Sequence, residues 1–381
     1  MNTTEFLRLK GVDMSAIVAG AQASVGLGPD DLLLAVGSLA EGLGNSMSDF
    51  DLILITPRDA AYLPAHDVAL VVETCLFDIQ LLPLQKLEAV LARFAKWAAL
   101  PWDITRIADI NIGDRRLLHR LLHCSVVFEG EASDLTELLP SRAELARLKL
   151  QIARHTSRTI QVDMAGDLEA DDYASLVFAS QDLLGHAVDA LAAGHHLTNP
   201  TAKWRSRLLQ RLPTNWEAAL GIHPTGLNAA QLYWTLHQAP ERPDRAPVLG
   251  HALRITTFAR AVFAWAERRL LGVTAGARAP GAWPHVDRTY GDICLPHLNF
   301  DVDFCAHDDR VILGRLNQFD EPLDLTPHEF EIALLFDGAT TAREAELVVR
   351  GAYASKAEHR LVDRVMVRVA AAGFSVGPEL M

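Results

Sequence analysis

The sequence lacks several features that would place it in a specialised class of proteins. Its 381 residues include four cysteines, Cys75, Cys124, Cys294 and Cys305, and no two of them form a C-x-x-C pair. Neither a zinc knuckle nor a dithiol redox centre is therefore expected. No stretch approaches the roughly 18 apolar residues of a transmembrane helix, and the N-terminal segment MNTTEFLRLKGVDMSAIVAG lacks the basic start and unbroken apolar run of a signal peptide. We expect a reduced, cytoplasmic protein with no membrane partner.

Positive charge is also scarce. Lysine and arginine together number 35, against 48 aspartates and glutamates, so the formal net charge is -13 at pH 7. Binding to nucleic acid without regard to base sequence draws its energy from Lys and Arg side chains that neutralise phosphates. The charge balance therefore disfavours a nucleic-acid partner. Half of the residues are hydrophobic, and a chain of this length can bury a sizeable core in two or three domains without disulfides.

The texture of the sequence changes along the chain. Residues 1–130 alternate between strand-like and helical patterns, which predicts a small mixed sheet with helices on it. Its apolar runs are Leu32–Val36, Leu52–Ile55 and Leu76–Leu82. Residues 131–272 contain long Ala- and Leu-rich segments, which predict a helical bundle. Residues 273–284, VTAGARAPGAWP, concentrate Gly, Ala and Pro without periodicity and are predicted to be a linker.

Residues 285–381 are predicted to form a third domain. Short strand-like segments occur at DICLPHLNF, RVILGRLN and EPLDL, and three helical segments follow them. Thr326-Pro327-His328-Glu329 is a capping box with proline at the first helical position, and Thr341-Ala342-Arg343-Glu344 is a second capping box. The last helix should stop at Gly373, because glycine readily adopts the left-handed conformation that ends helices.

Two segments near the N-terminus carry residues suited to phosphate and metal chemistry. The run LLLAVGS places Gly37 and Ser38 at the end of a buried strand, where glycine lets the backbone approach phosphate and the following helix start offers N–H groups. Asp49 and Asp51 flank Phe50 at the start of the next strand. Residues i and i+2 of a strand project from the same face, so the two carboxylates point together. Adjacent carboxylates repel each other, and Mg²⁺ is the usual relief.

A third carboxylate should come from a neighbouring strand. The run CLFDIQLL contains Asp78 between apolar residues, and we predict that Asp78 ligates the metal and accepts the proton of an attacking hydroxyl. Glu73, just before this strand, is the alternative. Nucleotidyl transfer requires a cradle for a triphosphate and carboxylates that hold divalent cations, commonly two, across the attacking and leaving oxygens. This short region is predicted to offer both.

These residues resemble a known family. The segment VGSLAEGLGNSMSDFDL is similar to the motif of the minimal and aminoglycoside-type members of the DNA polymerase β-like nucleotidyltransferase superfamily, in which Gly-Ser precedes Asp-x-Asp by a gap of about ten residues. The resemblance covers roughly residues 25–100. It implies transfer of a nucleoside monophosphate from a nucleoside triphosphate, foremost ATP, to an acceptor. It assigns Asp49, Asp51 and Asp78 to catalysis and two Mg²⁺ ions, and Gly37, Ser38, Ser48 and Lys203 to the nucleotide.

Two further details belong to this resemblance. The segment HHLTNPTAKWRSRLLQRLP looks like the substrate-side helical segment of such enzymes, with Lys203 and Trp204 as the recognisable pair. Glu41 departs from the family, because relatives often carry a basic or neutral residue there, near the phosphates. An acid at this position would oppose triphosphate binding unless its side chain points away.

Residues 285–375 resemble the winged-helix peptide-binding module of ribosomal-peptide modification pathways, the recognition element typified by the small chaperone of pyrroloquinoline quinone biosynthesis. The resemblance rests on RVILGRLN, on LDLTPHEFEIALLFDGATTAREAELVV and on the final helix. It implies capture of a leader peptide as an added strand on the sheet edge. A winged helix that reads DNA is the competing interpretation, and the acidic residues around Asp301 and Asp303 argue against it. A purely structural cap stays open.

Other signals are interpreted as structural. His119 and His123 are spaced i, i+4 in LLHRLLHC but lack the adjacent Glu of a zincin, so we interpret them as ordinary helix residues. Asp171 and Asp172 should begin a helix, where acids favour the positive end of the dipole.

The sequence therefore predicts an α+β protein with a nucleotidyltransferase domain, a helical middle domain and a C-terminal winged helix of three strands and three helices. The preferred hypothesis is nucleotidylation of a peptide or peptide-bound intermediate. A small hydroxylated acceptor of the aminoglycoside kind is the second, and a non-catalytic peptide carrier is the third.

Overall fold

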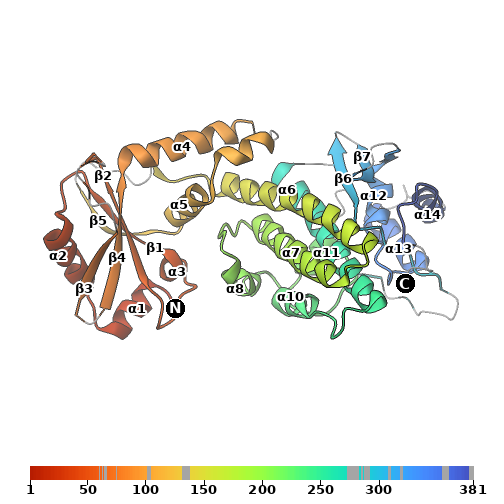
Figure 1. The fold of residues 1–381 in the computed structure, drawn as a ribbon, viewed down its shortest axis with the longest axis horizontal. Coiled ribbons are helices and arrows are strands. Elements are labelled where there is room, and N and C mark those ends of the chain that lie inside the picture. The colour runs from red at the N-terminus through yellow and green to blue at the C-terminus, as the bar shows by residue number, and fades with distance from the viewer. Residues whose placement is uncertain are drawn as a thin grey trace. The chain divides into compact units, whose positions relative to one another are not determined.

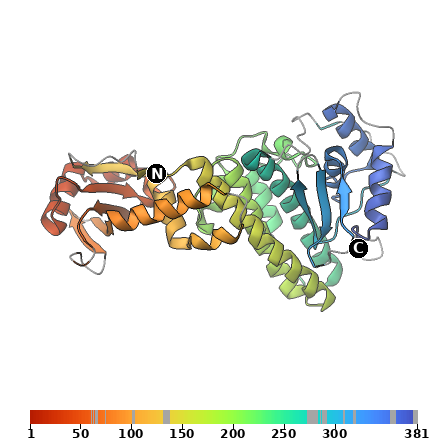
Figure 2. The ribbon, with the colours of Figure 1, turned by 90° about the horizontal axis from the view of Figure 1, so that it is seen from above.

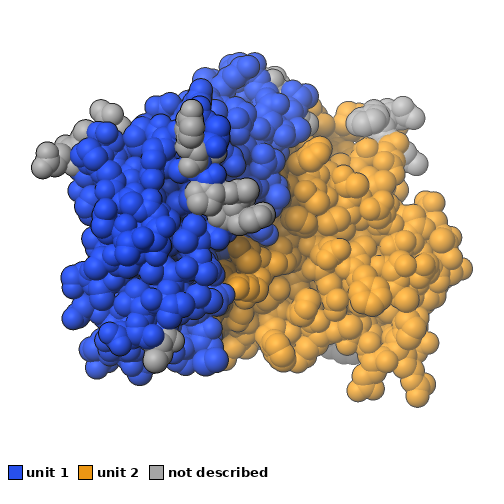
Figure 3. Space-filling view, turned by 60° about the vertical axis from the view of Figure 1, so that its left-hand side comes forward, with its two compact units in different colours: residues 1–148, 198–200 blue, residues 149–197, 201–381 orange. Residues whose placement is uncertain are grey.

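The structure is a computed structural model that describes residues 1–59, 61, 63, 67–73, 75–100, 104–130, 138–272, 283, 284, 286, 292–307, 310–317, 321–353 and 360–376. The chain divides into two compact units (Figure 3). The first unit is Met1–Leu148 with Thr198–Pro200, and the second is Lys149–Leu197 with Thr201–Met381. Both units contain helices and strands, which confirms the α+β class. The predicted domain boundaries stay predictions, and most of the predicted linker lies outside the described residues.

The first unit contains a five-stranded sheet with the order β3-β4-β2-β1-β5 (Figure 1). β2 and β4 run parallel, whereas the other neighbouring strands run antiparallel, so the sheet is mixed as predicted. The strands are β1 (Leu32–Val36), β2 (Phe50–Thr56), β3 (Val68–Val72), β4 (Cys75–Pro83) and β5 (Ser125–Glu129). β1, β2 and β4 match the three predicted apolar runs. β3 and β5 were not predicted, because they are edge strands whose side chains are partly exposed.

The two faces of this sheet pack against different helices. One face packs against α1 (Thr3–Lys10) and α2 (Met14–Val25) in a cluster that includes Phe6, Leu33 and Phe77. The opposite face packs against α4 (Leu84–Ala98) and α5 (Ile112–Leu122) in a second cluster that includes Leu34 and Leu87. Because successive side chains of a strand alternate between faces, burial of one set of residues fixes where the remaining polar side chains point.

Local sequence rules account for the helices around the sheet. α4 begins directly after Pro83, and α5 begins after Asn111, whose side chain accepts a hydrogen bond from the Asp114 N–H at 2.9 Å. α3 (Gly37–Ala40) is a single turn after β1, and η2 (Ile104–Asp109) is a 3₁₀ segment.

Long helices dominate the second unit. They are α6 (Arg142–Glu169), whose first turns belong to the first unit, α7 (Tyr173–Gly194) and α11 (Arg245–Leu271). Between α7 and α11 lie shorter segments, namely η4 (Ala202–Trp204), α8 (Arg205–Leu209), α9 (Trp216–Leu220) and α10 (Ala229–His237). Asp172 caps the start of α7 through the Ser175 N–H at 3.0 Å, which confirms the helix start expected there.

The C-terminal part has three strands followed by three helices. These are β6 (Val302–His307), β7 (Arg310–Arg315), β8 (Leu323–Leu325), α12 (Pro327–Ala333), α13 (Ala342–Tyr353) and α14 (Leu361–Ala371). Both predicted capping boxes are confirmed, at Thr326 and at Thr341. Gly373 has the predicted left-handed backbone, with φ at 66°. The three-stranded sheet has the order β6-β7-β8 and lies between the long helices and the C-terminal helices (Figure 2).

One predicted strand is wrong. The segment DICLPHLNF forms isolated bridges at Cys294 and Leu298, and the first strand begins afterwards, at Val302. Pro296 interrupts the segment and has no N–H to donate to a ladder. In β6 the side chains of Val302 and Phe304 lie in the hydrophobic core, whereas that of Asp303, which is also buried, pairs with Arg154.

The helices and the small sheet of the second unit share one hydrophobic core. Buried side chains of α11, β6, α12 and α14 belong to a single cluster, which includes Leu253, Phe263, Phe304, Phe330 and Val365. Removing the C-terminal part would therefore expose apolar surface on the long helices. Among the described residues, no helix is long and apolar enough to span a membrane.

Candidate active site

Gly37 lies at the end of β1, beside the carboxylate of Asp51. The register pairs Val36 with Asp51 across β1 and β2, and the backbone of Gly37 has φ at +80°, in the left-handed region. A Cβ atom at position 37 would lie 2.2 Å from Oδ2 of Asp51 and 3.1 Å from its Cγ. A side chain at this position is therefore excluded on two grounds, sterics and backbone conformation. The glycine predicted for close approach is required by the Asp51 carboxylate.

Asp51 and Asp78 lie directly opposite each other. β2 and β4 are parallel, and Asp51 pairs with Asp78 in their register. Paired residues on neighbouring strands project from the same face and lie about 4.8 Å apart. Phe50 and Phe77, one residue earlier, point to the opposite face, where their ring centroids are 4.9 Å apart in the core. Asp49 lies just before β2, so its predicted place beside Asp51 stays a prediction.

The alternative third carboxylate lies elsewhere. Glu73 occupies the turn between β3 and β4, where it adopts φ of 53°. The register pairs Phe50 with Phe77 and Asp51 with Asp78, and the pairing of β2 with β4 begins at Phe77. Glu73 thus lies before the paired part of β4, so Asp78 is the better third carboxylate.

Sequence reasoning missed a basic residue at these carboxylates. Arg120 of α5 lies with Nη2 3.9 Å from Oδ1 of Asp51, and its Nη1 donates to Oε1 of Gln80 at 3.2 Å. Asp49 and Asp78 form no ion pair with any residue that the structure describes. The Arg120 guanidinium thus lies beside Asp51, and a divalent cation would relieve the repulsion between the neighbouring carboxylates of Asp51 and Asp78. No sequence pattern around Arg120 indicated this contact.

The two serines behave differently. The Ser48 hydroxyl accepts a hydrogen bond from the Asn45 N–H at 2.8 Å and so closes the turn that leads to Asp49. The Ser38 carbonyl accepts the N–H groups of Leu43 and Gly44 at 2.8 and 2.9 Å, which fixes the loop after β1. Within the described part of the chain the Ser38 hydroxyl has no hydrogen-bond partner, so it can donate to a ligand. Ser48 acts as a turn residue in this structure, and its role at a nucleotide stays a prediction.

Glu41 points into the protein. Its carboxylate accepts from Nδ2 of Asn199 at 2.6 Å and lies 3.0 Å from Nε2 of His119, and its side chain is 3% exposed. Burial alone raises the pKa of Glu41, but the hydrogen bond and positive charge of His119, with the hydrogen bond of Asn199, hold that pKa below its ordinary value. Glu41, the acid that departs from the motif of the resembled family, thus forms buried hydrogen bonds with His119 and Asn199.

His119 joins this contact to a distant loop. Its Nδ1 lies 2.9 Å from Oγ1 of Thr198, on the side of the ring opposite Glu41. Hydroxyl, imidazole and carboxylate stand in the order of a catalytic triad. Thr198, however, is 2% exposed, so its hydroxyl cannot reach a substrate. The arrangement is a buried clasp between the loop after β1, α5 and residues 198–200.

The same corner carries a candidate metal ligand set. Glu41, His119 and His123 each offer one ligand atom, and these atoms lie within 4.8 Å of one another. Two histidines and one glutamate are a known ligand set for zinc. Here His119 and Glu41 already satisfy each other, and Nε2 of His123 lies 3.5 Å from Nη1 of Arg142. The sequence interpretation of ordinary helix residues missed that these side chains converge.

Lys203, predicted to contact the nucleotide, belongs to the second unit. It lies in η4, is exposed, and stands with its ammonium 4.8 Å from the ring centroid of Trp204. Arg207 lies 5.2 Å from the same ring. These cation–π contacts favour a stable local geometry. The role of Lys203 at a nucleotide stays a prediction.

A cleft of about 390 Å³ opens on the sheet face that carries Asp51 and Asp78. It is lined by residues of β4, α4 and α5 and by the segment before α5. The charged or polar lining residues are Gln80, Lys86, Asn111, Asp114, Arg116 and Arg120. Gln80 is two positions from Asp78 on β4, and Arg120 contacts both Gln80 and Asp51, so the cleft adjoins the carboxylates.

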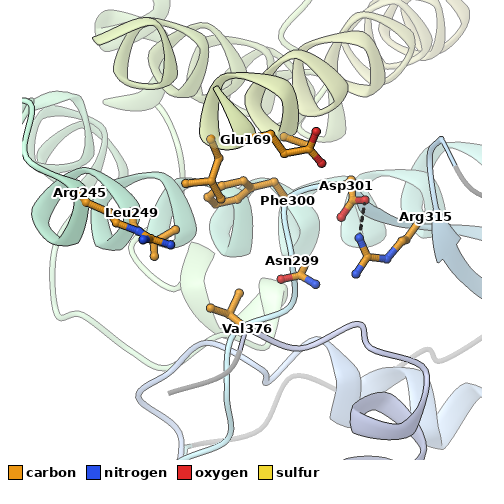
Figure 4. Close-up of a pocket in the computed structure, with 10 residues that line it drawn as sticks. Glu169, Arg245, Leu249, Asn299, Phe300, Asp301, Arg315 and Val376 are labelled. Carbon is orange, nitrogen blue, oxygen red and sulfur yellow. Dashed lines mark hydrogen bonds and ion pairs between the residues drawn. The ribbon is translucent and has the colours of Figure 1, made fainter. Parts of the chain in front are cut away.

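A smaller cavity, of about 140 Å³, lies in the second unit (Figure 4). Its lining combines apolar side chains such as Leu249, Phe300 and Val376 with Arg245 and Glu169. Arg315 closes one side through an ion pair with Asp301, at 3.1 Å. The cavity contains none of the predicted site residues.

The two edges of the small sheet differ. Side chains of the long helices donate hydrogen bonds to main-chain carbonyls on the outer edge of β6 and just before it. Gln161 donates to the carbonyl of Phe300 at 2.8 Å, Arg260 to that of Val302 at 3.0 Å and Arg154 to that of Phe304 at 3.0 Å. Arg154 is fixed by Asp303 and Glu267, each at 2.7 Å. A peptide strand therefore cannot add to β6.

Fewer side chains donate hydrogen bonds to the main chain at the β8 edge among the described residues. Arg368 of α14 donates to the Asp324 carbonyl at 2.5 Å, which shows that this carbonyl points outward from the sheet. Because the N–H and C=O of one residue in an antiparallel strand point to the same side, the Asp324 N–H also faces outward. The side chain of Asp324 pairs with exposed Arg310. β8 is the edge at which a peptide could add.

A search against protein-family models and a search of curated proteins each found no match to this chain. The geometry of the side chains therefore carries the functional conclusions. In the first unit it concentrates on Gly37, Asp51 and Asp78, and in the second on the edge strand β8.

Proposed function

We propose that the first unit is a Mg²⁺-dependent nucleotidyltransferase domain, which moves a nucleoside monophosphate from a nucleoside triphosphate, preferentially ATP, to a hydroxyl acceptor. The observation that carries this proposal is the placement of the Asp51 carboxylate between a glycine that leaves it room and Asp78 on the neighbouring parallel strand. The combination is specific, because Gly37, Asp51 and Asp78 come from three different strand segments and meet at one place in the sheet.

The oxygen donors fit Mg²⁺, which prefers carboxylates together with substrate phosphates. Asp49, Asp51 and Asp78 would hold the ions, and a bound ion would stabilise the charge that develops on the triphosphate. Ser38 donates a hydrogen bond to the phosphates. Asp78 accepts the proton of the acceptor hydroxyl, whose oxygen forms a bond to the α-phosphorus. The bond between that phosphorus and the oxygen bridging to the β-phosphate breaks, and pyrophosphate leaves.

The proposal for the second unit is that its C-terminal part is a winged-helix module that captures a peptide acceptor. Support comes from the order of three strands and three capped helices, from the closed edge at β6 and from the outward N–H and C=O of Asp324 at β8. A peptide that adds to β8 would take the place of Arg368 at the Asp324 carbonyl. The helical segments and this module would form a single body around their common core.

The catalytic proposal is tested by pyrophosphate release. With ATP and Mg²⁺, and with water in the place of the acceptor hydroxyl, the wild-type protein should release AMP and pyrophosphate slowly. This activity should be lost in Asp49→Asn, Asp51→Asn and Asp78→Asn. Asp30→Asn, an exposed aspartate in the turn before β1, is the matched control and should keep full activity. Activity that persists in the Asp49 and Asp51 variants would contradict the assignment.

Peptide capture needs a variant that keeps the fold, because deletion of residues 285–381 would strip the common core. Asp324→Pro removes the outward N–H of β8 without removing a bond to β7, whereas Asp324→Ala keeps that N–H. Short peptides encoded beside the gene, labelled for fluorescence anisotropy, are the probes. We expect binding to Asp324→Ala and loss of binding in Asp324→Pro. Equal binding to both variants would exclude strand addition at β8.

A further inference from the structure

We infer that the cleft between β4, α4 and α5 is the acceptor subsite and that it selects an acceptor bearing a phosphate or carboxylate group. This inference rests on the proposed nucleotidyl transfer and adds the chemical class of the acceptor to it. It depends on three observations: the side of the carboxylates on which the cleft lies, the charge of its lining, and its distance from Asp78.

The position of the cleft follows from the strand order. Gly37 follows β1, Asp51 lies on β2 and Asp78 on β4, and these strands are adjacent in that sequence across the sheet. The proposed triphosphate cradle is thus on the β1 side of the carboxylates. Gln80 and Leu82 of β4 line the cleft, which places it on the Asp78 side. An acceptor hydroxyl that gives its proton to Asp78 would arrive from this side.

The lining of the cleft is cationic. Lys86 of α4 and Arg116 and Arg120 of α5 contribute three positive charges to it. Arg120 is held between Asp51 and Gln80, but neither Lys86 nor Arg116 has an ion-pair partner within the part of the chain that the structure describes. The chain has more acidic than basic residues, with a formal net charge of -13. A cleft lined by three cations therefore differs from the average charge of the chain.

The acid in the lining does not offset this charge. Asp114 accepts from Nη2 of Arg93 at 2.8 Å and from Nδ2 of Asn111 at 3.1 Å. Arg93, which does not line the cleft, therefore already neutralises the charge of Asp114. The first turn of α5, an 11-residue helix, adds the positive end of its dipole at Gly113, which also lines the cleft. Asn111, Gly113 and the three cations together favour an anion.

The distance sets the size of the acceptor. Gln80 lies two residues beyond Asp78 on β4, which corresponds to about 7 Å along the strand. An acceptor with its hydroxyl at Asp78 would carry its anionic group about 7 to 10 Å away, beside Lys86 and Arg116. A phosphorylated metabolite and an acidic peptide segment both satisfy this requirement. A polycationic acceptor such as an aminoglycoside does not, because like charges at this range repel.

The test uses O-phosphoserine as probe, with glycerol as the uncharged comparison and kanamycin as the cationic one. Isothermal titration is carried out on the full chain with Mg²⁺ and an excess of an ATP analogue whose α–β bridging oxygen is a methylene group. The triphosphate site is then filled, so any phosphoserine that binds must occupy another site. We expect O-phosphoserine to bind under these conditions, and glycerol and kanamycin to give no detectable heat of binding.

Variants locate the binding. Lys86→Gln and Arg116→Gln should each weaken phosphoserine binding about tenfold, the loss expected for one charge-assisted hydrogen bond. Lys96→Gln on the same helix as Lys86, and Arg8→Gln on α1, remove exposed cations that do not line the cleft. These two variants should bind phosphoserine as the wild type does. Circular dichroism of all four checks that the fold is kept.

Two results would overturn the inference. If the ATP analogue displaces phosphoserine, the cleft belongs to the triphosphate. If Lys86→Gln and Arg116→Gln bind phosphoserine like the wild type, the cleft is not the site. The nucleotidyl-transfer proposal is tested separately, by pyrophosphate release in the Asp51 and Asp78 variants. The phosphoserine titration does not measure that activity.

Discussion

Two groups of side chains that contain acids lie within the first unit, and their surroundings differ. Glu41 is buried, and His119 and Asn199 bind it closely. Asp51 and Asp78 lie at a partly open sheet face, side by side, with Arg120 at 3.9 Å from Asp51. The first group is complete without a ligand, and its contribution is to stability. The second gathers like charge next to a cleft, a costly arrangement that is expected where a protein binds a cation and phosphates.

The largest expected effect is a loss of activity on substitution of Asp51 or Asp78, which distinguishes these acids from Glu41. Asp51→Asn and Asp78→Asn should each lower pyrophosphate release by about a thousandfold, equivalent to roughly 4 kcal/mol in the activation free energy. The same variants should keep the wild-type urea midpoint or exceed it, because each removes one of two neighbouring charges. Steady-state pyrophosphate assays and urea unfolding followed by circular dichroism measure the two quantities. A variant that loses activity and several kcal/mol of stability together would show that these acids are structural.

The next effect concerns the buried group. His119→Ala leaves the Glu41 carboxylate buried without its imidazole partner, and such losses cost about 3 kcal/mol in the free energy of unfolding. Glu41→Gln combined with His119→Ala should cost less than His119→Ala alone, because the uncompensated charge is gone. Urea unfolding of the single and double variants gives the comparison. A double variant no more stable than His119→Ala would contradict a stabilising contact between the Glu41 carboxylate and the His119 imidazole.

A smaller effect is expected at the glycine that joins β1 to the site. Gly37→Ala places a methyl group in the space of the Asp51 carboxylate and a side chain at φ of +80°. We expect a loss of about 2 kcal/mol in the free energy of unfolding. In the Asp51→Ala background the steric part disappears, so Gly37→Ala should cost only about 1 kcal/mol there. Equal costs in both backgrounds would mean that the carboxylate does not constrain residue 37.

The smallest effect is a pH dependence. Burial raises the pKa of Glu41, but the interactions with His119 and Asn199 outweigh it and hold the folded pKa below the ordinary value of 4.5. A lowered folded pKa means that the unfolded state binds the proton more readily, so Glu41 stabilises the fold fully above pH 4.5 and less as the pH falls through the folded pKa. The stability difference between wild type and Glu41→Gln should therefore shrink on acidification below pH 4.5. A stability difference that grows on acidification would show that folding raises the pKa of Glu41, contrary to this account.

Local patterns in the sequence predicted the parts of the fold that depend on neighbours along the chain. LLLAV reads directly as a strand that is buried on both faces, and the capping boxes at Thr326 and Thr341 mark helix starts by short-range hydrogen bonds. Alternation alone places Asp49 and Asp51 on one side of a strand. These features follow from residues within a few positions of each other.

The features that the sequence left hidden depend on long-range packing. Arg120 reaches Asp51 because α5 crosses the sheet face, and Glu41 turns inward because Asn199, 158 positions further along the chain, supplies a hydrogen-bond donor. No pattern around either residue indicates its partner. The wrong strand at DICLPHLNF shows the reverse case, in which an apolar pattern was read without weighing the missing N–H of Pro296.

Divalent cations should bind at Asp51 and Asp78 and not at Glu41, His119 and His123, and the proposed function depends on this choice. Electron paramagnetic resonance of Mn²⁺, titrated into the protein with the methylene ATP analogue, tests it most directly. We predict Mn²⁺ binding that is lost in Asp51→Asn and Asp78→Asn and unchanged in His123→Ala. Binding that survives in both aspartate variants and disappears in His123→Ala would contradict the proposed site.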